Sequence, residues 1–211
     1  MSSARAAVLA RVRFAIGSAR RETPVSRSYR RKDELSSGAR VELLCERVSD
    51  YRAEVRRVAA AELPAAITAA FTARGATRVG IPAGVPAEWR ASELELVEDN
   101  DLSFAELNGL DGVLTGCTLA IAETGTLVLT AGPTEGRRAL TLIPDLHVCV
   151  VHESQVVELV PEAIAALRDR RTRPLTFISG PSATSDIELS RVEGVHGPRS
   201  LSVIVTFEEL T

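Results

Sequence analysis

Apolar residues recur at helical spacing in three stretches near the start of the chain. The spacing of three or four residues predicts helices over about residues 3–20, 41–48 and 63–71. Pro64 near the start of the third stretch and Gly75 just past its end are typical helix boundaries. Residues 21–38 lack this period and are basic, which predicts a loop that is solvated or that surrounds an anion.

The rest of the chain alternates short apolar runs with Gly and Pro, which is typical of strands joined by turns. The run 146–151 is apolar at almost every position, so we expect it in the middle of a sheet with both faces covered. The unit 53–81 predicts two parallel strands joined by a right-handed crossover helix. Short helices are expected at 103–108 and 161–167. The expected strands are residues 53–58, 77–81, 94–97, 112–115, 119–122, 126–130, 139–143, 146–151, 175–179 and 201–207.

This order of elements predicts an α/β fold, a mostly parallel sheet with helices on both faces plus some antiparallel hairpin strands. A length of 211 residues, of which 45% are hydrophobic, suits one domain of ordinary size with a helical appendage. We therefore divide the chain into an N-terminal helix and basic loop, residues 1–38, and an α/β domain, residues 39–211.

Charge and cysteine content narrow the class of protein. A net charge of −3 and 4% aromatic residues argue against nucleic acid as a partner. The three cysteines are far apart and include no C-x-x-C, so a disulfide framework or a thiolate-held metal is not expected. We expect a cytoplasmic protein with no membrane span, since no apolar run reaches 18 residues. The arginine-rich start favours an amphipathic helix over a transit peptide, and it lacks the apolar core of a secretory signal.

The segment Ala120–Thr126 places a carboxylate and two hydroxyls in a turn between two strands. Glu123 at a strand end can act as a nucleophile or general base. Thr124, Gly125 and Thr126 can bind an anionic substrate, and Gly125 can adopt a positive φ. The alternative is a hairpin turn in which Glu123 and Thr124 satisfy local amides.

A row of small polar residues follows the strand that ends near Ser179. Free amides at a strand-to-helix turn favour a phosphate or carboxylate, and the hydroxyls add donors. We favour this role over that of a helix cap. The segment matches neither a Walker loop nor a dinucleotide-binding loop. The candidate anion-binding residues are Gly180, Ser182, Thr184 and Ser185, with Asp186 beside them.

Two histidines stand in different settings. His147 is the second residue of a predicted buried strand, where a hydrogen-bonded core histidine is more common than a catalyst. His196 lies on a glycine-framed loop before the last strand. It is a candidate acid/base or anion contact, and the alternative is an exposed histidine without a role.

These segments together resemble the lactate-utilization protein C family, whose members share the LUD domain. The resemblance rests on AIAETGT from Ala120, PDLHVCVV from Pro144, GPSATSDIE from Gly180 and GVHGP from Gly194. It runs through about residues 100–207. It implies a fold similar to ribose-5-phosphate isomerase, glucosamine-6-phosphate deaminase and the class I CoA transferases.

The resemblance also implies a function: conversion of L-lactate to pyruvate together with iron–sulfur partner proteins. This chain would hold no cofactor itself, and the clusters would lie in the partners. Glu123 corresponds in place to the nucleophilic glutamate of class I CoA transferases, so we expect Glu123 and His196 as the ionisable pair, with Asp186 orienting. The alternative is a stand-alone transferase or ligase acting on a CoA, nucleotide or folate-like substrate. A third alternative is a structural subunit with a vestigial cleft.

Overall fold

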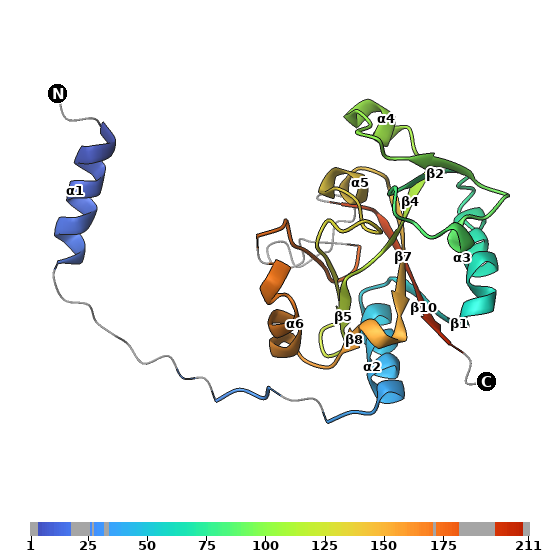
Figure 1. The fold of residues 1–211 in the computed structure, drawn as a ribbon, viewed down its shortest axis with the longest axis horizontal. Coiled ribbons are helices and arrows are strands. Elements are labelled where there is room, and N and C mark those ends of the chain that lie inside the picture. Colours follow the sequence, from blue (N-terminus) through green and yellow to red (C-terminus); the bar gives the residue numbers. More distant parts are fainter. Residues whose placement is uncertain are drawn as a thin grey trace.

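A six-stranded sheet with all strands parallel forms the centre of the molecule (Figure 1). The computed structural model describes residues 4–17, 26, 28–31, 34–170, 172–181 and 197–208. Across the sheet the strands are β1 (Glu54–Ala59), β10 (Ser200–Phe207), β7 (Leu146–His152), β4 (Gly112–Gly116), β2 (Arg78–Ile81) and β3 (Glu95–Glu98).

Strand β7 is covered on both faces, as its continuous apolar sequence predicts. Val148 and Val150 pack into the core cluster that contains residues of helix α3 (Leu63–Thr72). Cys149 and Val151 point the other way, into the cluster that contains residues of helix α2 (Ser37–Asp50). Because side chains alternate along a strand, one apolar strand serves both cores.

A second, four-stranded sheet lies beyond α2. Its order is β8 (Val156–Val157), β5 (Leu119–Ile121), β6 (Thr126–Leu129) and β9 (Thr176–Ile178). Strands β5 and β6 form the predicted antiparallel hairpin, and β9 pairs antiparallel with β6. One face of this sheet shares a core with α2, and the other packs on helix α6 (Val160–Ala166).

The remaining elements are short. Helix α4 (Phe104–Asn108) begins with a capping box formed by Ser103 and Glu106. Helix α5 (Arg138–Leu142) packs beside it. Four 3₁₀ turns lie at Ala60–Glu62, Ala87–Trp89, Glu153–Gln155 and Arg168–Arg170.

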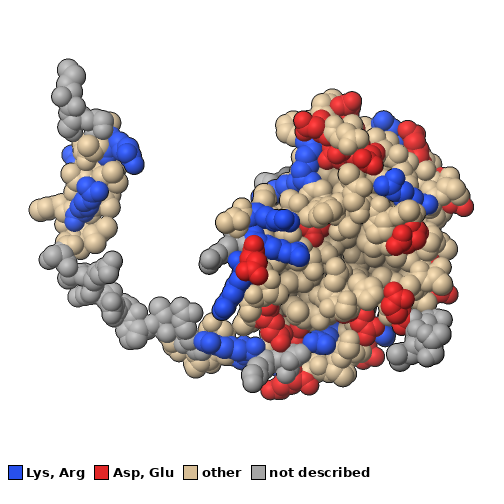
Figure 2. Space-filling model, viewed as in Figure 1, with Lys and Arg blue, Asp and Glu red and all other residues tan. Residues whose placement is uncertain are grey.

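Helix α1 (Ala4–Ile16) lies apart from these layers (Figure 1). It has no buried residue. Figure 2 shows basic side chains on this helix and no acidic ones, whereas both signs are mixed over the visible face of the α/β body. Among the residues that the structure describes, no helix is long and apolar enough to cross a membrane.

The structure corrects three expectations. Residues 139–143, predicted as a strand, fall mainly in helix α5, and α2 begins at Ser37, inside the predicted loop. The strands β1 and β2 lie in one parallel sheet but are not neighbours, because β10, β7 and β4 lie between them. The expected antiparallel hairpin strands are present and lie in the separate four-stranded sheet.

Candidate functional site

The turn that carries Glu123 is fixed by its backbone. After β5, the amides of Ala122 and Glu123 donate to the carbonyl oxygens of Val157 and Glu158, at 2.8 and 3.0 Å. Gly125 closes the turn with a φ of +59°. Since the backbone makes these bonds, the Glu123 carboxylate is not needed to satisfy them, and its side chain remains 48% exposed.

Arg30 joins two carboxylates across the surface. One guanidinium nitrogen lies 3.2 Å from Glu123 Oε1 and the other 3.0 Å from Glu158 Oε1. The Glu158 side chain is only 2% exposed. Its second oxygen accepts the amides of Glu34 and Leu35, at 2.7 and 2.9 Å. These amides, and secondarily the charge of Arg30, hold the pKa of Glu158 below its ordinary value. An ionised Glu158 therefore holds the basic segment against the body.

A surface hollow of about 970 Å³ opens beside this cluster. The charged residues that line it are Arg30, Arg31, Arg168, Glu123 and Glu162. Helix α6 forms a mostly apolar wall of this hollow and also carries Glu162. The wall residues are Leu159, Val160, Pro161, Ile164 and Ala165. We call this space the Glu123 hollow.

The Glu123 hollow combines the features that a small carboxylate requires. A planar guanidinium binds a carboxylate through two parallel hydrogen bonds. An apolar wall excludes water from the rest of the ligand and strengthens those bonds. Glu123 adds a carboxylate, a group that can accept a proton, to the lining of the hollow.

The other residues of the turn form a chain of hydroxyl groups. Thr124 Oγ1 lies 2.7 Å from Thr126 Oγ1, which lies 2.8 Å from Ser179 Oγ. This chain connects the Glu123 turn to the segment that enters Gly180, so two motifs far apart in the sequence meet here. Their predicted anion-binding role stays a prediction.

Gly125 and Gly180 both approach the end of helix α2 closely. A Cβ at Gly125 would lie 2.8 Å from the Cβ of Arg47, and one at Gly180 would lie 2.4 Å from the Cβ of Tyr51. Gly180 also has a positive φ, +84°. Close packing against α2 therefore explains why both positions are glycine. The five predicted site residues Ser182, Thr184, Ser185, Asp186 and His196 lie outside the described residues.

His147 is a core residue, as its position in the sequence favoured. It is fully buried, and Nε2 lies 2.8 Å from Thr115 Oγ1 on the neighbouring strand β4.

Cys149, two residues further along the same face, is buried beside Cys117. Hydrogen bonding from Cys117 and, to a lesser extent, from His147 lowers the pKa of Cys149 to about 6. Cys45, Cys117 and Cys149 are all free thiols. Within the described ranges, no three His, Cys, Asp or Glu side chains gather as metal ligands would.

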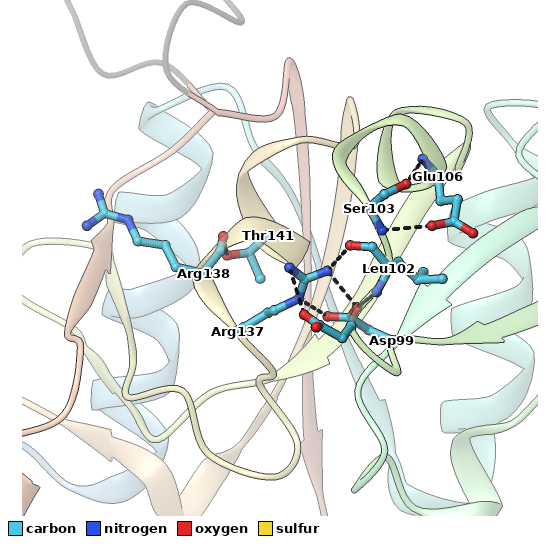
Figure 3. A network of polar contacts seen from close by, with 8 residues as sticks. Asp99, Leu102, Ser103, Glu106, Arg137, Arg138 and Thr141 are labelled. Carbon is cyan, nitrogen blue, oxygen red and sulfur yellow. Dashed lines mark hydrogen bonds and ion pairs between the residues drawn. The ribbon is translucent and has the colours of Figure 1, made fainter.

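A second polar network, absent from the sequence predictions, ties β3 to α5 (Figure 3). Arg137 donates from Nε and Nη2 to the two oxygens of Asp99, at 2.8 and 2.9 Å. The same guanidinium donates to the carbonyl oxygen of Leu102. The Arg137 hydrogen bonds lower the pKa of Asp99, whose side chain is 3% exposed. Because these contacts engage the guanidinium on several sides, we assign the network a structural role.

Together, fold and site define an α/β protein in which a parallel sheet and a small covering sheet support an arginine–carboxylate hollow. The LUD domain family model matches residues 87–206. The chain therefore belongs to the LUD domain family.

Individual relatives agree with this assignment. The chain is 50% identical over 163 residues to a lactate utilization protein C of Deinococcus radiodurans, covering 76% of each chain. It is 33% identical to a protein of the same name from Anoxybacillus flavithermus, over 44% of this chain and 42% of that one. A crystal structure of a DUF162 family protein from Deinococcus radiodurans superposes with a TM-score of 0.72 and 45% identity. It covers 82% of this chain and 99% of that chain.

Proposed function

We propose that this chain is the component without a cluster in a system that oxidises L-lactate to pyruvate with iron–sulfur partner proteins. Relatives named lactate utilization protein C support the pathway. The observation that carries the substrate class is the Glu123 hollow, which three arginines and two carboxylates line together with apolar residues. Lactate presents a carboxylate, a hydroxyl and one methyl group, which match these three parts.

The residues of the hollow would divide the work as follows. Arg168 and Arg31 bind the substrate carboxylate, and the methyl group lies on Val160 and Ile164. Glu123 accepts the hydroxyl proton as the carbonyl of pyruvate forms. The oxidation breaks the O–H bond and the Cα–H bond of lactate and releases two protons and two electrons. Glu123 would take the hydroxyl proton, the Cα proton would pass to solvent, and clusters held by the partners would accept both electrons.

The cysteine content is consistent with placing the clusters in the partners. A cluster of the common kind is held by four thiolates, and the whole chain has three cysteines. Two of these, Cys117 and Cys149, are buried in the core between α2 and the sheets. We therefore propose that this chain binds and orients lactate, while its partners accept the electrons.

The test uses the tagged full chain, purified from its host during growth on lactate. Iron content, the identity of co-purified proteins and lactate-dependent dye reduction are measured. We expect iron–sulfur partners, and we expect Glu123→Gln to reduce dye reduction at least ten-fold. The control, Glu46→Gln, replaces an exposed carboxylate on α2 and should keep full activity.

Two results would contradict this proposal in different ways. Undiminished activity of Glu123→Gln would remove Glu123 from the site but keep the pathway. An isolated protein without iron or lactate-dependent activity would reject the pathway. The stand-alone transferase or ligase would then be tested by measuring binding of CoA esters, nucleotides and folates.

A further inference from the structure

Helix α1 exposes an unusual amount of apolar surface. Ten of its thirteen residues are apolar, and none is buried. Phe14, Ile16 and Val8 are 90%, 69% and 59% exposed. An isolated helix shorter than about 12–15 residues is marginal in water, because most helical stability comes from packing of an apolar face. The exposed residues of α1 therefore indicate a surface that is covered in the working protein.

The distribution of charge specifies the chemistry of that covering surface. Residues 1–32 contain nine basic residues and one acidic residue, a formal charge of +8. Residues 33–211 contain 16 basic and 27 acidic residues, a formal charge of −11. The described helix α1 carries Arg5, Arg11 and Arg13 and no acid (Figure 2). A partner of complementary charge is acidic.

The arrangement of α1 around its axis favours a groove over a flat surface. Successive residues are about 100° apart, so Val8, Val12 and Ile16 form one stripe, which Arg5 continues toward the start of the helix. Arg11 and Arg13 flank that stripe on its two sides, and Phe14 lies on the opposite side of the helix. A helix that lies flat on a membrane separates its polar and apolar faces. Apolar residues on opposite sides of α1 instead require contact on more than one side.

The length of the connecting chain limits how far this helix can lie from the Glu123 hollow. Tyr29, Arg30 and Arg31 line the hollow, and Arg30 is held by Glu123 and Glu158. Ile16 and Tyr29 are 13 positions apart in the sequence, so the chain between them spans at most about 45 Å when extended. A protein that holds α1 is thereby kept close to the proposed lactate site.

We propose that α1 is the docking helix of this chain, and that it inserts into an apolar groove with a carboxylate rim on an iron–sulfur partner. This inference rests on the proposed function and names the contact that would join the components. Val8, Val12 and Ile16 fill the groove floor, Phe14 contacts its outer wall, and Arg11 and Arg13 pair with the rim. Helix α1 then keeps the iron–sulfur partner, which accepts the electrons, attached to the chain that binds lactate.

The test compares full-length tagged variants purified from the lactate-grown host. Val12→Asp places a charge in the apolar stripe, and Arg11→Glu with Arg13→Glu reverses the flanking charges. The matched control is Arg56→Glu with Arg173→Glu, two exposed arginines on the α/β body. The amounts of iron and of iron–sulfur proteins per tagged chain are measured, together with the melting temperature of each variant.

We expect both α1 variants to retain less than a tenth of the iron–sulfur protein, with melting temperatures unchanged. The body control should retain it all. Equal retention by all variants would overturn the docking helix and leave the proposed function intact. Absence of iron–sulfur protein from the unaltered chain would overturn both. Binding of the unaltered chain to phosphatidylglycerol vesicles, lost in Val12→Asp without any loss of partner, would assign α1 to a membrane and reject the proposal.

Discussion

Glu158 illustrates how one buried carboxylate organises a surface. It accepts two backbone amides from residues 34 and 35 and pairs with Arg30. Through these contacts the chain before α2 is attached to the strand β8 and, through Arg30, to Glu123. The position of Glu123 in the site thus depends on a neighbour outside its own turn.

The pKa of Glu158 gives this contact a defined pH dependence. The pKa is lower in the folded state than its ordinary value of 4.5. Its contribution to stability is therefore complete above about pH 4.5 and is lost as the pH falls through the lowered folded pKa. We expect Glu158→Gln to destabilise the protein at pH 7, with the difference from the unaltered protein shrinking below pH 4.5. Urea unfolding between pH 7 and 3.5 measures this difference, and Glu93→Gln on the exposed surface is the control. A difference that grows toward low pH would contradict the assignment.

The Asp99–Arg137 pair makes a second residue-scale prediction. Replacing Arg137 with Met leaves the Asp99 carboxylate nearly buried without its bidentate partner. Hydrogen bonds to charged groups contribute about 1.5–3 kcal/mol, so we expect a loss of about 2 kcal/mol in the free energy of unfolding. Denaturant unfolding of Arg137→Met, Asp99→Asn and the double variant forms a cycle that isolates the pair. Additive losses would show that the two side chains do not interact.

At the scale of elements, the β5–β6 turn and the end of α2 fit together only because Gly125 lacks a side chain. In Gly125→Ala the alanine must adopt a positive φ, and its Cβ lies within 3 Å of atoms of Arg47. We expect it to lower the free energy of unfolding by about 2 kcal/mol or more. Gly38→Ala is the matched control: its added Cβ meets no atom within 4 Å, and in α2 it should stabilise by about 0.5 kcal/mol. Thermal unfolding measures both, and an unaffected Gly125→Ala would contradict the close packing.

Some helices and strands could be predicted from the sequence, and others could not. The apolar run of β7 predicted a central strand, since few other places bury every residue of such a segment. Four of the five residues 139–143 are apolar, and over so short a run helix and strand share the same pattern. Their helical form follows from contact with α4, which the local sequence does not encode.

Only part of the Glu123 site could be predicted from the sequence. Glu123 was recognised from its turn, but Arg30 and Glu158 lie 93 and 35 positions away along the chain. Their contact depends on a separate second sheet, and no local period predicts how two sheets stack. The basic composition of residues 21–38 was the one sequence feature that pointed to this contact. It allowed two interpretations, a solvated loop or a loop that surrounds an anion.

At the scale of the whole molecule, the N-terminal segment divides into two parts with different effects on stability. Helix α1 buries nothing, so deletion of residues 2–17 should change the free energy of unfolding by less than about 0.5 kcal/mol. Deletion of residues 2–31 also removes Arg30, which pairs directly with Glu158, so the melting temperature should fall. Calorimetry of the two truncations measures both effects. A large loss on removal of α1 alone would show that this helix packs on the body.

The place of β10 in the main sheet has a consequence for synthesis of the protein. The last strand lies between β1 and β7, so β1 pairs with residues encoded some 150 positions later. While the ribosome is still translating the gene, β1 has no strand to join, and the apolar residues of β7 lack one neighbour. Closing so long a loop is slow. The sheet is therefore incomplete until β10 has left the ribosome, and a premature stop codon within β10 would yield an aggregating product rather than a slightly shortened one.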